Sequence, residues 1–129
     1  MNTNTPILSS KDLMSTSEIQ SFLRNKDNHR TLIVSLGKDS IITTRTLPET
    51  RPDIPGLILD LPKDNQSTGI AALSLADDLN PIGKDIDWAQ KLSSSIRSIG
   101  EAFVDRILIK GNKYFSYADE AVHNLPKQK

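Results

Sequence analysis

The stretch TLIVSLGKDSIITTRTL, residues 31–47, is the clearest β signal in the chain. Two runs rich in Ile, Val and Thr, residue types enriched in strands, flank the short loop Gly37-Lys38-Asp39. Glycine tolerates the positive φ that a tight hairpin loop needs. The pattern therefore predicts a β-hairpin with strands over about residues 31–36 and 40–46.

The C-terminal part contains a second hairpin, which follows a long helix. In RILIKGNKYFSYA, residues 106–118, the pair Gly111-Asn112 is a favoured two-residue turn between two strand-like runs. The preceding segment, residues 85–103, begins with acids that suit a helix start. Its apolar residues recur in steps of four, four, three and four and predict one buried helix face: Trp88, Leu92, Ile96, Ile99 and Phe103.

Two elements are expected around these hairpins, one before the first and one after it. Ser15 and Glu18 form an S-x-x-E capping box, which predicts a short amphipathic helix ending near Lys26. GLILDL, residues 56–61, is a continuous apolar run between two prolines and is interpreted as a buried strand.

Two further helices complete the expected set. GIAALSLADDL, residues 69–79, has apolar residues at helical spacing, with Ser67 or Thr68 as its N-cap. A short closing helix is expected over about residues 118–125, before Pro126.

The expected order is α-β-β-β-α-α-β-β-α, which favours an α/β (α+β) fold with one mostly antiparallel five-stranded sheet packed with helices. Residues 1–14 are expected to be a flexible N-terminal tail, residues 15–125 a single globular domain and residues 126–129 a C-terminal tail. Three prolines make residues 48–55 an extended loop, which is too short to separate two hydrophobic cores.

The composition excludes several classes of function. The chain has 129 residues, 36% of them hydrophobic, as expected of a soluble domain. It carries 16 basic and 16 acidic residues, so the basic footprint of a nucleic-acid binder is absent, and so is the charge that would recruit it to an anionic membrane. Without cysteine there is no disulfide, no Cys-ligated zinc and no thiol catalysis. We expect a cytoplasmic protein without a membrane segment.

PKDNQSTGIAALSLADD, residues 62–78, is the main candidate for a ligand site. A helix that begins at Ser67, Thr68 and Gly69 offers unpaired N–H groups to a phosphate or carboxylate. Asp60 ends the expected strand just before them, at an edge where ligands bind in open α/β sheets. The P-loop and dinucleotide motifs need more glycines and a lysine that this segment lacks. An ordinary N-cap, with Asp60 paired to an arginine, is the alternative.

Two resemblances to known families bear on function. LILDL followed by STGIAAL resembles the STAS domain of anti-sigma-factor antagonists, which implies a regulatory phosphorylation at Ser67; Gln66 stands where that family has an acid. The order of a hairpin (residues 31–47), a long helix and VDRILIKGNKYFSYA is similar to the plan of roadblock/longin-like adaptors. That resemblance implies an adaptor that binds other proteins.

No motif identifies a catalytic or metal site. His29 and His123 have no companion at metal-ligand spacing, and no G-x-S-x-G elbow exposes a serine. We expect no metal and no cofactor. Tyr114, Phe115 and Tyr117 alternate along the last expected strand, so Tyr114 and Tyr117 would form an interaction surface if that strand is a sheet edge.

These observations favour a non-enzymatic regulatory or adaptor-type protein that acts by binding another protein, and an edge hairpin would also permit a homodimer. The alternative is a small-ligand or phosphate-binding domain, or an enzyme, with its site at residues 60–69. A STAS-like, phospho-regulated antagonist is a further alternative.

Overall fold

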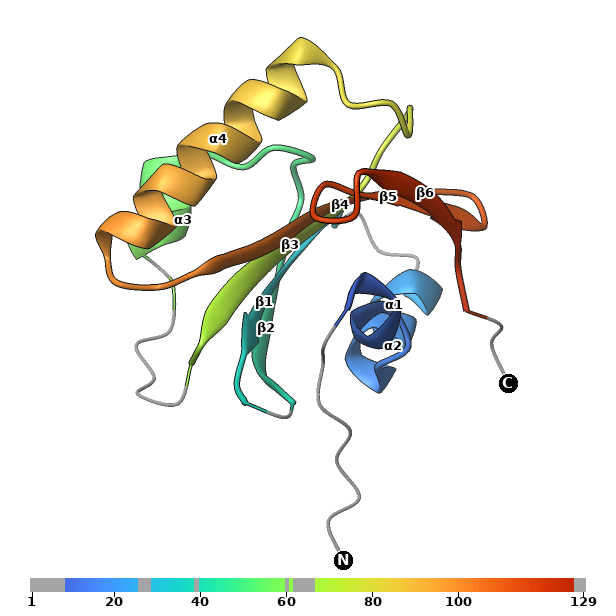
Figure 1. Ribbon diagram of the computed structural model, residues 1–129, viewed down its shortest axis with the longest axis horizontal. Coiled ribbons are helices and arrows are strands. Elements are labelled where there is room, and N and C mark those ends of the chain that lie inside the picture. Colours follow the sequence, from blue (N-terminus) through green and yellow to red (C-terminus); the bar gives the residue numbers. More distant parts are fainter. Residues whose placement is uncertain (1–8, 26–28, 39, 60, 62–66, 127–129) are drawn as a thin grey trace, which may run out of the picture.

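A six-stranded sheet lies between two layers of helices (Figure 1). The computed structural model describes residues 9–25, 29–38, 40–59, 61 and 67–126. The helices are α1 (Ser10–Met14), α2 (Ser17–Arg24), α3 (Ile54–Leu59) and α4 (Gly83–Ser98). The strands are β1 (Thr31–Leu36), β2 (Ile41–Leu47), β3 (Gly69–Leu75), β4 (Phe103–Lys110), β5 (Lys113–Ser116) and β6 (Ala121–Asn124). In the described part of the chain, no helix has both the length and the apolar character needed to cross a membrane.

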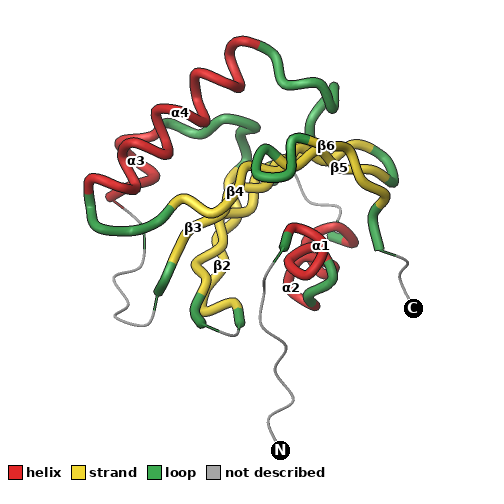
Figure 2. The backbone as a smooth tube through the Cα atoms, viewed as in Figure 1, coloured by secondary structure: helices red, strands yellow, loops and turns green. Residues whose placement is uncertain are grey.

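The strand order is β2-β1-β3-β4-β5-β6. The pair β3 and β4 is parallel, and the other four neighbouring pairs are antiparallel. The parallel pair requires a crossover connection, which α4 supplies. The two helix pairs lie on opposite sides of the strands (Figure 2).

Each face of the sheet buries its own hydrophobic cluster. On the α1–α2 face, Leu13, Met14, Ile19 and Phe22 pack on alternate residues of the central strands. On the side of the sheet that α3 and α4 cover, the cluster consists of Ile33, Leu57, Ile70, Ala72, Trp88, Leu92 and Ile96. The central strands β1 and β3 are buried on both faces, as strands covered by two layers of helices must be.

The predicted mixture of helices with one open sheet is confirmed, and both hairpins are present as β1–β2 and β4–β5. The sheet has six strands rather than five, and the order of elements differs from the expected one. The long helix is also present, as α4, although its stripe ends at Ile96. Ile99 is 49% exposed at the helix end, and Phe103 begins β4.

The expected strand over residues 56–61 is wrong, because Ile54–Leu59 form the helix α3. The side chain of Asp53 accepts a hydrogen bond from the Gly56 N–H at 3.1 Å, and Leu57 N–H donates to the Asp53 carbonyl at 3.0 Å. Asp53 therefore caps this helix, and Pro55 stands in the first turn, where no N–H is needed. A six-residue apolar run does not by itself separate a helix from a buried strand.

The expected helix after Ser67 is also wrong, because Gly69–Leu75 form β3. β3 pairs with β1 on one side and with β4 on the other, so it is a central strand of the sheet. Its sequence is apolar without interruption because both of its faces are buried. Pairing on both sides overrides the helix propensity of its alanines and leucines.

The two ends of the chain also differ from expectation. Ala121–Asn124 form the edge strand β6 rather than a closing helix, and the burial of successive residues alternates as in a half-covered strand. Ser10–Met14, inside the expected tail, form α1 and bury Leu13 and Met14. The tail prediction therefore does not hold for these residues. Thr16, not Ser15, caps α2 through its side chain.

A glycine at position 69 is required by the close approach of β4, and this gives a first prediction. A Cβ at Gly69 would overlap Cγ2 of Val104 and would lie 3.2 Å from the backbone oxygen of Ala102. Gly69→Ala should lower the free energy of unfolding by about 1–3 kcal/mol, because the β-branched side chain of Val104 has to move away and the backbone at Ala102 has little room to yield. Urea denaturation followed by circular dichroism measures this change.

Gly83→Ala is the matched control. A Cβ at Gly83 meets no atom within 4 Å, and Gly83 begins α4. This substitution should be neutral or should stabilise by up to about 1 kcal/mol, since alanine is the better helix former. Equal losses from the two substitutions would contradict the packing explanation.

Candidate functional site

The residues predicted to bind a ligand lie at the start of β3 instead of at a helix N-terminus. Asp60 lies outside the described residues. Ser67 accepts a hydrogen bond from Ser35 Oγ at 3.0 Å and donates to Glu101 at 3.3 Å. The N–H of Thr68 donates to the Leu36 carbonyl at 2.7 Å. These contacts join β3 to its neighbours, so the helix dipole on which the phosphate prediction rested is missing. Ligand binding by Ser67, Thr68 and Gly69 stays a prediction without that support.

The two tyrosines predicted to form an interaction surface occupy different environments. Tyr114 is 1% exposed, because β6 covers β5 and its ring packs in the α1–α2 cluster. Burial raises the pKa of its hydroxyl, which lies 3.2 Å from Ser10 Oγ. Tyr114 is therefore not a surface residue. Tyr117 is half-buried on the other face, and its hydroxyl donates to Asp85 at 2.5 Å.

Beneath α4, a charged cluster is buried against the sheet. Arg106, in the middle of β4, is 0% exposed, and Asp85, in the first turn of α4, is 1% exposed. The guanidinium donates to both oxygens of Asp85, at 2.6 Å and 3.2 Å. This two-pronged geometry is the strongest arrangement for an arginine and a carboxylate. It joins the first turn of α4 directly to β4.

The remaining donors of Arg106 reach the neighbouring strand and the loop after β2. One nitrogen donates to Ser74 Oγ of β3 at 2.6 Å, and another donates to the Thr50 carbonyl at 3.3 Å. Ser74 Oγ in turn lies 2.7 Å from Thr31 Oγ1 of β1. A continuous polar row therefore crosses β1, β3 and β4 within an otherwise apolar layer.

Trp88 of α4 covers the guanidinium of Arg106. Its ring lies 4.4 Å from the guanidinium carbon of Arg106, a cation–π distance. Its indole N–H donates to the Pro52 carbonyl at 2.8 Å. One side chain of α4 therefore holds both the buried arginine and the proline-rich loop that leads into α3.

The electrostatics of Asp85 reflect two opposing effects. Burial by itself raises the pKa of Asp85, because it penalises the charged form. Hydrogen bonds and charge from Arg106, with further bonds from Tyr117 and Arg51, outweigh this effect and hold the pKa below its ordinary value. Asp85 in turn raises the pKa of Tyr117, which burial has already raised. The two shifts favour an ionised Asp85 and a protonated Tyr117, as expected of a structural salt bridge.

The carboxylates beside this cluster do not form a metal site. Asp77, Asp78 and Asp85 line one small cavity of about 110 Å³. Arg30 lies 3.5 Å from Asp77, and Arg51 lies 3.0 Å from Asp85, so arginines already neutralise two of them. Among the described residues, no group of three acidic or histidine side chains is placed to hold a metal ion.

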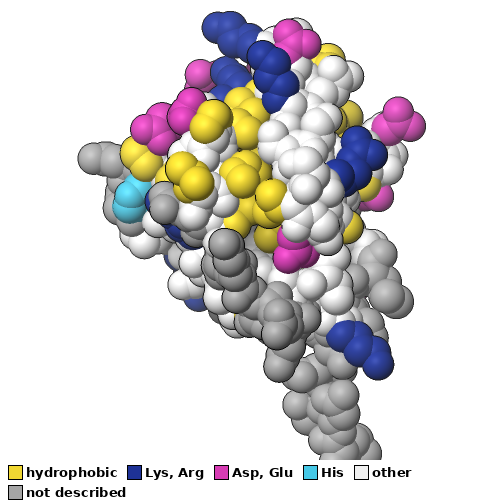
Figure 3. Space-filling model, turned by 90° about the vertical axis from the view of Figure 1, so that its left-hand side faces the viewer, with side chains coloured by type: hydrophobic (Ala, Val, Ile, Leu, Met, Phe, Trp, Pro, Cys, Tyr) yellow, Lys and Arg dark blue, Asp and Glu magenta, His cyan; other side chains and the backbone are white. Residues whose placement is uncertain are grey.

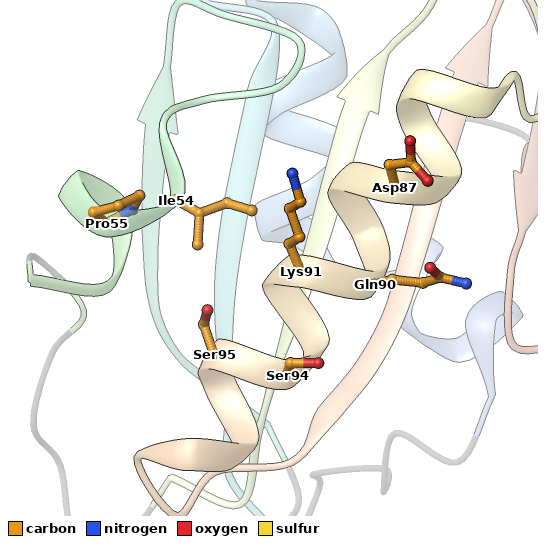
Figure 4. Close-up of a pocket in the computed structure, with 7 residues that line it drawn as sticks. All are labelled: Ile54, Pro55, Asp87, Gln90, Lys91, Ser94 and Ser95. Carbon is orange, nitrogen blue, oxygen red and sulfur yellow. The ribbon is translucent and has the colours of Figure 1, made fainter.

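Two surface grooves run along the sides of α4. The first, of about 490 Å³, lies between α3 and α4 and is lined by Ile54, Pro55, Asp87, Gln90, Lys91, Ser94 and Ser95. The second, of about 460 Å³, lies between α4 and the β4–β5 side of the sheet and is lined by Ile86, Ala89, Gln90, Ser93, Ser94, Arg97, Phe103 and Tyr117. Gln90 and Ser94 line both grooves and form the crest of α4 between them. In Figure 4, Ile54 projects from α3 toward α4, whereas Gln90 and Ser94 point away from α3.

Two apolar side chains of α3 and α4 are exposed. Leu59, at the end of α3, is 83% exposed, and Ile86 of α4 is 38% exposed. Figure 3 shows hydrophobic side chains gathered in the middle of this side of the molecule, with charged side chains of both signs around them. We call the exposed surface of α3 and α4 with its two grooves the α3–α4 face.

Sequence reasoning missed the buried cluster and this face. Asp85 was interpreted as a helix-capping acid, although it is the partner of Arg106. The available signal was Arg106 itself, a charged residue that precedes the apolar run ILI in a strand. A buried arginine needs a carboxylate partner, but the sequence does not say which of the acids supplies it.

Comparison with known proteins gives the chain no family. No protein-family model matches the sequence, and no significant match to a curated protein was found. The turn from strand to helix that the STAS resemblance requires is absent at Ser67, where the chain continues as β3. The hairpin–helix–hairpin order is present, with α3 and β3 inserted before α4.

The buried pair gives a second prediction. Asp85→Asn removes the charge that balances Arg106 and should lower the free energy of unfolding by about 3–5 kcal/mol. Asp87→Asn, two residues along the same helix at an exposed position, should change it by less than about 0.5 kcal/mol. Chemical denaturation of the three proteins measures both values, and equal stability of the wild type and Asp85→Asn would refute the assigned role.

The same variant gives a prediction for pH. Because the pKa of folded Asp85 lies below its ordinary 3.8, the ionised form stabilises the fold above about pH 4. This contribution is lost as the pH falls through the folded pKa. The stability difference between the wild type and Asp85→Asn should therefore be constant from about pH 5 to 8 and shrink below about pH 4. Asp105, whose pKa burial raises, affects both proteins and cancels in the difference. A difference that shrinks near neutral pH would contradict this assignment.

Proposed function

We propose that this chain is a non-enzymatic regulatory or adaptor-type domain that binds another protein through the α3–α4 face. The observation that carries the proposal is the open groove of about 490 Å³ between α3 and α4, in which Ile54 and Pro55 of α3 lie opposite polar side chains of α4. An exposed apolar patch with a charged surround is the usual anatomy of a protein-binding surface. The occupant we propose is a partner protein that inserts apolar side chains between the two helices.

The composition of α4 suits such contact. Ser93, Ser94 and Ser95 are small, so the backbone of a partner can approach the helix closely. Asp87 and Lys91 place one charge of each sign on the rim of the first groove. Charges on the rim of an interface select a partner of complementary pattern and contribute little to affinity.

The rigidity of the layer also supports binding. Arg106, Asp85 and Trp88 tie α4 to the sheet and to the loop before α3, so the groove is held open in one shape. A preformed surface loses less conformational entropy on association. The side chains of Arg106 and Asp85 are almost completely buried, which supports a structural role for their charges over a catalytic one.

Photo-crosslinking tests the proposal. A photoreactive amino acid at Gln90 or Ser94 should capture one protein from native host cells in stoichiometric yield, and excess unlabelled protein should abolish the capture. The same group at Ser21, on the exposed side of α2, is the control and should not capture it. Capture of the same protein from Ser21 with equal yield, or of none from α4, would overturn the proposal.

A substitution then tests the groove itself. Ser94→Arg places a long side chain on the crest shared by both grooves and should weaken binding of the captured partner tenfold or more, about 1.4 kcal/mol. Ser21→Arg adds the same side chain on the opposite helix layer and should bind normally. Both residues are exposed, so both variants should keep the wild-type melting temperature. Unchanged affinity of a folded Ser94→Arg would contradict binding at this face.

A further inference from the structure

The two edges of the sheet differ in how they are protected. β6 has four residues, and Pro126 follows it after one residue, so this edge is short and soon ends. β2 has seven residues, Ile41–Leu47, and the described part of the chain contains no strand on its outer side. An unpaired edge strand is a template for another strand, and natural proteins usually shorten it, charge it or interrupt it with proline.

β2 carries little of this protection. It contains neither proline nor glycine, and its single charged residue is Arg45. Five of its residues, the two isoleucines and three threonines, are β-branched and therefore favour a strand. The register shifts between Ser35 and Leu36 of β1, whose partners are Thr43 and Ile41, and the pairing of Thr43–Leu47 is regular. Regular pairing with a further strand is therefore open to this segment.

The hydrogen bonds identify which backbone groups face outward. Leu47 accepts a hydrogen bond from the Arg30 N–H at 2.9 Å, so its backbone points toward β1. Alternate residues of a strand point to opposite neighbours, so Arg45 and Thr43 also face β1. Thr44 and Thr46 therefore direct their N–H and C=O groups away from the sheet, and their side chains are exposed as well.

We propose that two copies of this chain pair through β2 as an antiparallel, two-fold symmetric dimer, with Thr44 opposite Thr44 of the second copy. In this register the two Thr44 residues exchange both backbone hydrogen bonds, and Arg45 stands opposite a threonine. Sliding one strand by two residues would move the two-fold axis to residue 45 and set the two Arg45 side chains directly opposite each other, and like charges there are destabilising. The zero net charge of the chain adds no overall repulsion.

The symmetry has a consequence for the α3–α4 face. An antiparallel edge-to-edge pair keeps each face of the two sheets on one side, so two six-stranded sheets would become continuous. Both α3–α4 faces would then lie on the same side of the dimer. This inference rests on the sheet edge alone and stands or falls independently of the binding function proposed above.

Sedimentation velocity over a concentration series tests the dimer. The wild type should show a monomer–dimer equilibrium. Thr44→Pro removes only an outward N–H and should give a folded monomer. Thr44→Val keeps that N–H and should dimerise as the wild type does. A wild type that remains monomeric up to about 1 mM, or a folded Thr44→Pro that still dimerises, would overturn the proposal.

Cysteine crosslinking tests the register and does not depend on the proline variant folding. The chain has no cysteine of its own. Under mild oxidation Thr44→Cys should form a disulfide-linked dimer, because directly opposed residues are within disulfide reach. Thr46→Cys should not, since the two copies of residue 46 would be four residues apart along the strands, roughly 13 Å. No crosslink at residue 44, or equal crosslinking at both residues, would refute the register.

Discussion

The buried pair of Arg106 and Asp85 is the interaction on which the arrangement of the α3–α4 layer depends. Arg106 bonds at once to α4, to β3 and to the loop after β2. An apolar layer alone fixes neither the angle nor the sliding position of a helix, because hydrophobic contact is non-directional. The hydrogen bonds of the Arg106 guanidinium are directional, so they fix the position of α4 on the sheet. The pair is costly to desolvate, so its contribution is to make one packing much better than its neighbours rather than to add much stability.

The sequence predicts the local elements of this fold better than their assembly. The hairpins at residues 31–47 and 106–116 and the helix around Trp88 follow from alternation, turn chemistry and helical spacing. The predicted secondary structure of residues 54–59 and 69–75 was wrong: the first segment is a helix and the second a strand. A short apolar run has no period that distinguishes a strand buried on both faces from a helix. Two residues did indicate the start of α3: Asp53 is a typical N-cap, and Pro55 is tolerated in the first turn of a helix.

The candidate site shows the same limit. The phosphate hypothesis for Ser67–Gly69 required a helix that begins there, and the chain forms the strand β3 instead. Tyr114 was to form a surface only if its strand were a sheet edge, but β6 pairs with β5 on that side. The α3–α4 face and the β2 edge are properties of the sheet order, which depends on contacts between residues far apart in the chain. Local pattern does not contain them.

The most direct measurement of this account is native-state hydrogen exchange on Arg106→Lys. A lysine keeps the charge but cannot bond to Asp85, Ser74 and the Thr50 carbonyl together. The account predicts faster exchange in the first turns of α4, in residues 48–53 and in α3, while α1, α2 and the β1–β3 pair keep their protection. Uniform acceleration over the whole chain, or an unchanged α4, would contradict the claim that Arg106 holds the α3–α4 layer in place.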